Sequence, residues 1–168
     1  MPKVNYVKAR KDYPEASVKK GDMYYTWSLL LGPRSSRTYR QLTPPKRSQL
    51  TTSTFLQGIY DIEDRIASLT SLDDVEDIVQ ALRDLASEEE EKYDNLPEGL
   101  QQSDTGRRIE SRKDGCNTAA DEIEAAVEEF DEDEPEEEGE EKQAWLERKE
   151  DHNAEIIASI QAVDISYD

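Results

Sequence analysis

Apolar residues downstream of position 51 recur at helical spacing. One set has successive separations of 4, 3, 4 and 3 residues: Phe55, Ile59, Ile62, Ile66 and Leu69. A second set follows Ser71, a suitable N-cap, with separations of 3, 4, 3 and 4: Leu72, Val75, Val79, Leu82 and Ala86. Each spacing covers one face of a helix and is typical of coiled coils. The short link between the sets predicts that the two helices form an antiparallel hairpin.

Two further helices are predicted nearer the C-terminus. The first extends from about Thr105 to Phe130, after a loop with the sequence PEGLQQSDTG, and Gly115 weakens its middle by about 1 kcal/mol relative to alanine. Its apolar face is formed by Ile109, Cys116, Ala120, Ile123, Val127 and Phe130. Pro135 and Gly139 interrupt the pattern, and a last helix is predicted from about Glu141 to Val163. Its apolar residues are Trp145, Leu146, Ile156, Ile157, Ile160 and Val163.

The N-terminal third has the pattern of β-strands. Met23 to Leu31 is rich in tyrosine, tryptophan and leucine, the sequence GPRS suits a turn, and Arg37 to Leu42 suits a return strand. An isolated hairpin is marginal in water, so we expect a third strand from residues 3–8, or a helix, to cover it. Alternation predicts one shared face for Met23, Tyr25, Trp27, Leu29 and Leu31.

These patterns predict a mainly α protein of the α+β type. We expect a small N-terminal β-hairpin plus a three- to four-helix, partly coiled-coil body. Four segments are predicted: a basic aromatic hairpin region at 1–48, a helical body at 49–130, an acidic linker at 131–141 and a C-terminal helix at 142–168. Hydrophobic residues make up 35% and charged residues 36% of the chain, which is lean for a large core.

Charge divides the chain unevenly. Residues 1–50 hold eleven Lys/Arg and three Asp/Glu, a net charge of +8, whereas residues 51–168 have a net charge of −27, for a total of −19. Such asymmetry is typical of proteins that bind other macromolecules through charged surfaces.

The acidic residues allow two interpretations. Carboxylates held at fixed spacing on helices could imitate a phosphate backbone and dock on a basic groove. Alternatively, the run from Glu128 to Glu141, where eleven of fourteen residues are acidic, is a solvated linker. The candidate partner-binding acids are Glu88, Glu89, Glu90, Glu91, Glu136, Glu137 and Glu138. Further acids on predicted helices are Asp73, Asp74, Glu76, Asp77, Glu122, Glu124 and Glu128.

The basic N-terminal region also allows two interpretations. Its cations could meet phosphates while aromatic faces stack on bases, so nucleic acid is a possible partner of residues 1–50 only. Alternatively, the aromatic residues form the core of the hairpin and the cations offset the acidic helices. The candidate residues are Tyr24, Tyr25, Trp27, Arg37, Arg40 and Arg47. The acidic remainder of the chain would repel a duplex.

Other chemistry finds little support in the sequence. One cysteine and one histidine, Cys116 and His152, are too few for a zinc site, and the acidic run lacks the ligand pattern of a calcium loop. Cys116 lies on an apolar seam, which favours a buried, unreactive thiol, and His152 lies on a polar, exposed surface. Phosphate-loop and nucleophile-elbow motifs are missing. We therefore expect no enzymatic activity, no cofactor and no metal.

Location is predicted by what the sequence lacks. The N-terminus has no apolar region typical of a secretory signal, and no apolar run is long enough to span a membrane. A single cysteine suits a reducing cytosol.

Three stretches, in order, carry a resemblance: YVKARKDYPEASVKKGDMYYTW, PPKRSQLTTSTFLQGIYDIEDRI and YDNLPEGLQQSDTG. Over about residues 6–127 they resemble a group of small coiled-coil-containing proteins encoded by tailed phages and prophages. That group has no agreed activity, so the resemblance implies a setting rather than a site. The setting is the cytosol of an infected bacterium, where many phage products bind and block host factors.

The leading hypothesis is a phage-encoded acidic protein that docks on a basic host protein and inhibits it, the target being a nucleic-acid-handling or defence protein. The first alternative is a nucleic-acid-binding accessory protein that uses the basic hairpin. The second is an assembly protein that forms homo-oligomers through the apolar seams at residues 55–69 and 72–86.

Overall fold

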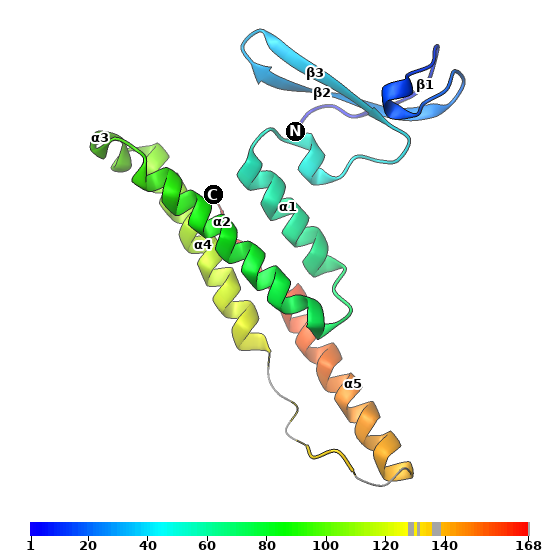
Figure 1. The fold of residues 1–168 in the computed structure, drawn as a ribbon, viewed down its shortest axis with the longest axis vertical. Coiled ribbons are helices and arrows are strands. Elements are labelled where there is room, and N and C mark those ends of the chain that lie inside the picture. Colours follow the sequence, from blue (N-terminus) through cyan, green and yellow to red (C-terminus); the bar gives the residue numbers. More distant parts are fainter. Residues whose placement is uncertain (128–129, 131, 136–138, 168) are drawn as a thin grey trace. The chain divides into compact units, whose positions relative to one another are not determined.

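The computed structural model describes residues 1–127, 130, 132–135 and 139–167. It confirms the predicted fold class, because helices dominate and a small antiparallel sheet lies at the N-terminus (Figure 1). The chain divides into two compact units, residues 1–61 and residues 62–168. Each unit is described by itself below. None of the described helices combines the length and the apolar character that a bilayer-spanning segment needs.

The sheet has three antiparallel strands in the order β1-β2-β3: Asn5–Lys8, Met23–Gly32 and Ser35–Gln41. The third strand expected from residues 3–8 is therefore confirmed as β1. The return strand begins two residues earlier than predicted, because a register irregularity between Leu30 and Gly32 lets Ser35 pair with Gly32. β1 pairs with β2 only at residues 23–26, so the rest of β2 is paired on one side, by β3.

Both faces of the sheet bury aromatic residues, which the alternation pattern alone did not predict. Trp27 and Leu29 are buried on the expected face, but Met23 and Leu31 at its ends are exposed. On the opposite face Tyr24 is buried against Ala9 and Val18. The predicted face is therefore buried only at its middle, and Ala9 and Val18 bury Tyr24 on the other face as well.

Trp27 joins the sheet to the segment that follows it. Its indole Nε1 donates a hydrogen bond to the carbonyl oxygen of Gln49, 3.0 Å away, in a 3-10 helix at Arg47–Leu50. Helix α1, Thr54–Ala67, starts soon after, and the Ser53 hydroxyl accepts from the amide of Leu56 in its first turn. The predicted seam of α1 is confirmed, since Phe55, Ile59, Ile62, Ile66 and Leu69 are all at most 5% exposed.

The second unit is built on a long helix pair. Ser71 caps a short 3-10 helix at Leu72–Asp74, as expected, and α2 follows at Val75–Asp94. Its main partner is α4, Asp104–Ala126, so the dominant helix pair is α2 with α4 rather than the predicted hairpin of the first two helices (Figure 1). Small buried residues on α4, including Ala119 and Ala120, allow the two backbones to approach closely.

Several predicted boundaries need correction. The loop preceding α4 contains a short helix, α3, at Glu98–Gln101. Helix α4 ends at Ala126, so Val127 and Phe130 lie beyond it, and Val127 is exposed. On α5, Glu140–Gln161, Leu146 is exposed although Trp145, Ile156 and Ile160 are buried.

Gly115 is needed for packing, which the low helix propensity of glycine does not reveal. A Cβ at this position would collide with the carbonyl oxygen of Ser166, so the C-terminal segment can lie against α4 only because residue 115 has no side chain. The segment contributes Ile165, which is 5% exposed, to the core. Glycine at position 115 destabilises the helix itself, but it allows the backbone at Ser166 to lie close to α4.

Candidate macromolecule-binding surfaces

The acidic cluster predicted at residues 88–91 is divided between surface and interior. Glu88, Glu90 and Glu91 are exposed, but Glu89 is only 1% exposed. Its carboxylate lies 2.6 Å from Lys92 Nζ and 3.8 Å from Arg112 Nη1. The assignment of Glu89 as a partner-binding residue is therefore wrong. The apolar spacing already places it on the seam, three residues after Ala86, and this signal was available in the sequence.

Four exposed acids form a line on α2 opposite its buried seam; we call them the α2 acidic stripe: Asp77, Asp84, Glu88 and Glu91. At 100° per residue these positions fall within about 60° of one another around the helix axis. The rise of 1.5 Å per residue separates neighbouring members by about 4.5 to 10 Å. A helix thus holds four carboxylates at distances comparable to those between phosphates of a nucleic-acid backbone.

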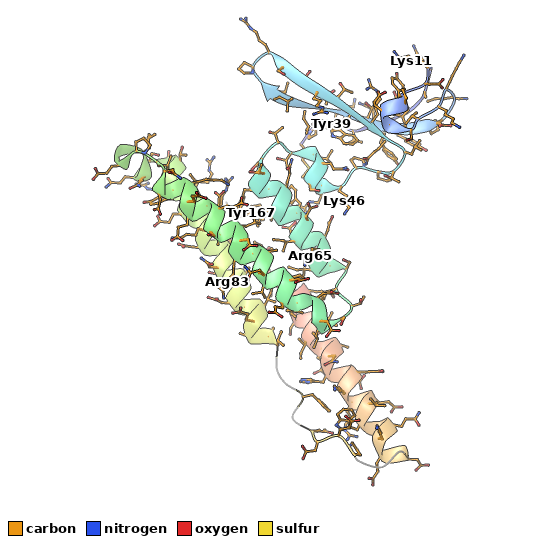
Figure 2. All side chains as sticks on the ribbon, viewed as in Figure 1. Lys11, Tyr39, Lys46, Arg65, Arg83 and Tyr167 are labelled. Atoms are coloured by element: carbon orange, nitrogen blue, oxygen red, sulfur yellow. The ribbon has the colours of Figure 1, made fainter. Side chains whose placement is uncertain are left out.

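Three cations of the α2–α4 pair contact acids of the other helix. Figure 2 labels Arg83, which belongs to α2. Its Nη2 lies 2.8 Å from Asp121 and 2.9 Å from Glu124 on α4. These hydrogen bonds raise the pKa of the Arg83 guanidinium. Arg112 approaches Glu89, and Lys113 lies 3.8 Å from Glu90. Within the stripe, Glu88 lies 3.9 Å from Lys92. Since Arg83, Arg112 and Lys113 contact other carboxylates, the stripe keeps most of its negative charge.

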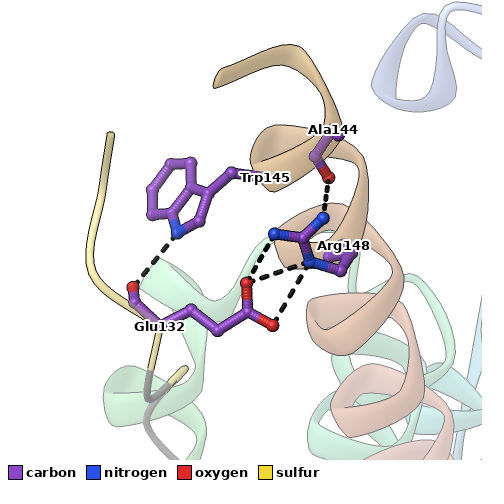
Figure 3. Close-up of polar contacts among 4 residues, drawn as sticks. All are labelled: Glu132, Ala144, Trp145 and Arg148. Carbon is purple, nitrogen blue, oxygen red and sulfur yellow. Dashed lines mark hydrogen bonds and ion pairs between the residues drawn. The ribbon is translucent and has the colours of Figure 1, made fainter. Parts of the chain in front are cut away.

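The acidic linker is partly described. Glu136, Glu137 and Glu138 lie outside the described residues. Glu132 accepts hydrogen bonds from the guanidinium of Arg148 on α5 at 2.7 to 3.2 Å, and its backbone oxygen accepts one from the indole of Trp145 (Figure 3). The hydrogen bonds with the Glu132 carboxylate raise the pKa of Arg148. Glu134 is paired with Lys142 at 3.2 Å. Two acids of the run therefore have structural partners on α5.

His152 also differs from its predicted place. Its ring lies 5.4 Å from that of Phe130, which in turn packs edge-on against Trp145 at 5.7 Å. His152 is half-buried in this small aromatic group rather than fully exposed.

The aromatic residues of the basic unit are occupied within the fold. Tyr24 and Trp27 are buried, and burial, followed by a hydrogen bond with Tyr13, raises the pKa of the Tyr24 hydroxyl. Tyr25 packs on Tyr6 with ring centroids 4.6 Å apart, and Tyr39 stacks on Trp27 at 5.6 Å. Tyr24 and Trp27 thus belong to the core of the first unit, whereas Tyr25 is half-buried beside the exposed Tyr6.

Three of the five arginines of this unit lie over tyrosine rings. Three such pairs have cation-to-centroid distances of 5.4, 4.4 and 4.2 Å: Arg37 over Tyr39, Arg40 over Tyr13 and Arg47 over Tyr60. Arg40 also lies 3.6 Å from Glu15. Cation–π contacts hold a guanidinium in place without neutralising it. Residues 1–61 hold eleven Lys/Arg and four Asp/Glu, so the unit carries a net charge of +7 on partly immobilised side chains.

An open cavity of about 330 Å³ adjoins β3 in the same unit. Tyr39, Arg40 and Gln41 of β3 line one side, and Gln49, Gln57 and Asp61 are among the residues that line the rest. The Gln41 and Gln49 side chains hydrogen bond to each other at 3.2 Å. This cavity was not predicted, because Gln57 and Asp61 reach the sheet only through the fold.

Within the described ranges, no group of three or more His, Cys, Asp and Glu side chains has an arrangement that could hold a metal ion. Cys116 is fully buried on α4, as its seam position predicted.

We expect the Cys116 thiol to be unreactive in the folded protein. Burial, with a smaller contribution from the charge of Glu89, raises its pKa from 9.0 to about 11. At pH 8 this shift alone lowers the thiolate fraction about 100-fold relative to the unfolded chain, and burial blocks access as well. Ellman's reagent should therefore label the protein promptly in 6 M guanidinium and more than 100-fold slower without it.

The same shift fixes a pH dependence for this residue. The neutral thiol's contribution to stability is complete below pH 9 and is lost as the pH rises from 9 to about 11, because the unfolded state ionises first. The variant Cys116→Ala is the control, since it should lack this part of the alkaline destabilisation.

In the labelling experiment with Ellman's reagent, rapid reaction of the native protein at pH 8 would show that α2 and α4 open readily around the thiol.

Comparisons of the chain with protein-family models, with curated proteins and with solved structures gave no match.

Proposed function

We propose that this protein binds the basic, nucleic-acid-binding surface of another protein through the α2 acidic stripe and inhibits that protein. The carrying observation is the use of charge in the α2–α4 pair: Arg83, Arg112 and Lys113 link the helices, while Asp77, Asp84, Glu88 and Glu91 stay on the outer face. A rigid helix that presents a carboxylate every one or two turns resembles the row of phosphates that a basic, nucleic-acid-binding groove recognises.

The biological setting is part of the proposal. The resemblance of residues 6–127 to tailed-phage proteins supports a phage product that acts in the cytosol of its bacterial host. In that setting the partner is a host protein with a basic surface, such as a nucleic-acid-handling or defence protein. The proposal assigns the protein no catalytic residue, cofactor, metal or membrane.

Self-assembly through the apolar seams is less well supported. An assembly protein needs exposed seam residues, and the α1 seam together with Val75, Val79, Leu82 and Ala86 is buried in the single chain. The seams are thus used within the monomer.

The stripe is tested with two variants of equal charge change. The first carries Asp77→Asn, Asp84→Asn, Glu88→Gln and Glu91→Gln. The control carries four amide substitutions at exposed acids of α5: Glu147→Gln, Glu150→Gln, Asp151→Asn and Glu155→Gln. Tagged proteins are incubated with nuclease-treated bacterial lysate, and bound proteins are released first with duplex DNA and then with a salt gradient.

We expect wild type and control to retain a protein that duplex DNA releases, and the stripe variant to retain at least about tenfold less, since several charge-assisted contacts are lost. Equal retention by the stripe variant would contradict the proposal. Equal loss in both variants would show that net charge, rather than the geometry of α2, drives binding.

A further inference from the structure

The outer edge of β3 is an open strand edge. In the order β1-β2-β3, β3 is hydrogen-bonded to β2 alone, and among the described residues no other backbone hydrogen bond involves Ser35–Gln41. Such an edge presents a row of amide and carbonyl groups that can pair with one more strand. Proteins usually protect edges with proline, bulges or inward-pointing charges, and β3, with the sequence SSRTYRQ, has no proline.

The side chains of β3 favour the approach of another strand from the side. Ser36 and Thr38 project from one face and are small, and Thr38 is held by a 2.9 Å hydrogen bond to Ser28. Arg37 belongs to the opposite face, beside Tyr39, whereas Arg40 belongs to the face of Thr38. The Arg37 guanidinium lies over the ring of Tyr39, and that of Arg40 lies over the ring of Tyr13, so little side-chain entropy remains to be lost on binding. Arg40 is also 3.6 Å from Glu15, so a carboxylate of an added strand would share this guanidinium with Glu15.

The cavity of about 330 Å³ supplies a third element of recognition. Trp27 and Leu29 of β2 line it together with Tyr39, Arg40 and Gln41 of β3, so it lies against these two strands, and no residue of β1 lines it. Glutamine side chains around it offer donors and acceptors, while Asp61 would repel an acidic side chain. An uncharged, hydrogen-bonding side chain of an added strand would fit it.

We propose that the β3 edge binds an extended acidic peptide segment of a partner protein by strand addition. Because Arg37 and Arg40 are three residues apart and on opposite faces, the added strand needs two carboxylates three positions apart, with an uncharged polar residue beside one of them. This spacing distinguishes strand addition from general electrostatic attraction to the first unit, with its net charge of +7. General attraction would give the same affinity whatever the order of the residues in the peptide.

The charge of the first unit favours an acidic segment over a second copy of this chain as the occupant. In a fully overlapping antiparallel pair of two β3 strands, Arg37 of one copy would lie opposite Tyr39 of the other, so the arginines themselves do not forbid pairing. What opposes it is the net charge of +7 on each of the two first units, which would repel one another. The β3 edge is independent of the α2 acidic stripe, since it lies in the first unit and would bind an acidic partner, whereas the stripe would bind a basic one.

The test uses fluorescein-labelled peptides and the full-length protein in anisotropy titrations. The probe TVEQVEVT has its glutamates three positions apart. The control TVEVEQVT has the same composition, but its glutamates are two positions apart and share one face. A third peptide is the probe with N-methyl groups on alternate residues, which remove backbone donors without changing charge. The protein variants are Arg37→Gln and, as a matched control at an exposed lysine outside the strands, Lys20→Gln.

We expect the probe to bind at least about tenfold more tightly than both the rearranged and the N-methylated peptide, because each loses one of the two kinds of contact. Arg37→Gln should weaken binding about three- to tenfold and Lys20→Gln less than twofold. Backbone amide signals of β3 in NMR spectra should shift on addition of the probe.

Other outcomes would overturn the proposal. Equal binding of all three peptides would mean charge attraction without strand pairing. Tighter binding of an oligothymidylate than of the probe would make the basic unit a nucleic-acid surface, and dimers in sedimentation that the probe does not dissociate would make the edge a self-association site. The α2 stripe variant should bind the probe normally, so the two proposals fail separately.

Discussion

Replacing Trp27 with alanine is expected to destabilise the N-terminal unit by about 3–5 kcal/mol, the usual cost of removing a buried tryptophan. The side chain is 3% exposed, stacks on Tyr39 and donates its indole hydrogen bond to Gln49. A three-stranded sheet with two small faces has few other contacts to compensate for this loss. The urea midpoint, followed by hydrogen exchange of amides in β2 and β3, measures the effect.

Trp27→Phe separates the two contributions of this residue. It keeps an aromatic ring but removes the Nε1–H donor, so a loss of about 1–2 kcal/mol is expected from the hydrogen bond and the smaller ring. If Trp27→Ala had the same midpoint as wild type, the sheet would not depend on the contact with the 3-10 helix at Arg47–Leu50.

The second large effect is expected at Glu89. Glu89→Lys places a third cation beside Lys92 and Arg112 in a buried position, and a loss of about 3–5 kcal/mol is typical for an uncompensated buried charge. Glu89→Met is expected to be close to neutral or slightly stabilising, because a well-packed apolar side chain often replaces a buried ion pair without loss. Chemical denaturation followed by the helical circular-dichroism signal measures both.

Glu88→Lys is the matched control. The Glu88 side chain is 59% exposed, and its ion pair with Lys92 is long, at 3.9 Å. Its charge reversal should therefore change stability by no more than about 0.5 kcal/mol. Similar midpoints for Glu88→Lys and Glu89→Lys would mean that Glu89 is accessible to water after all.

Local spacing predicted much of the helical part and little of its pairing. The 3-4 spacing identified the buried residues of α1 and most of those of α2, because a seam depends only on which side of a helix is apolar. It could not name α4 as the partner of α2, since the contacts between these helices join residues that are far apart in the sequence. Ile78 was missed because it lies beside the strict seam rather than on it.

The candidate sites show the same limit. Glu88–Glu91 reads as one acidic cluster in the sequence, yet the helix turns Glu89 inward while its neighbours face solvent. The sequence also made Tyr24 and Trp27 candidates for binding, because residue type alone does not distinguish an aromatic side chain in the core from one on the surface. The charge difference between the N-terminal and C-terminal parts of the chain, by contrast, depends on residue identity alone and follows directly from the sequence.

The ion pairs between α2 and α4 also constrain how this chain can change over time. Arg83 with Asp121 and Arg112 with Glu89 join the two helices at separate levels, so inserting or deleting one residue between these levels would mismatch at least one of them. Point substitutions on the outer face leave both intact. Descendants of this sequence should therefore vary freely in the identity of their surface acids while keeping α2 and α4 free of length changes, and the distances between surface positions would be inherited more strictly than the residues that occupy them.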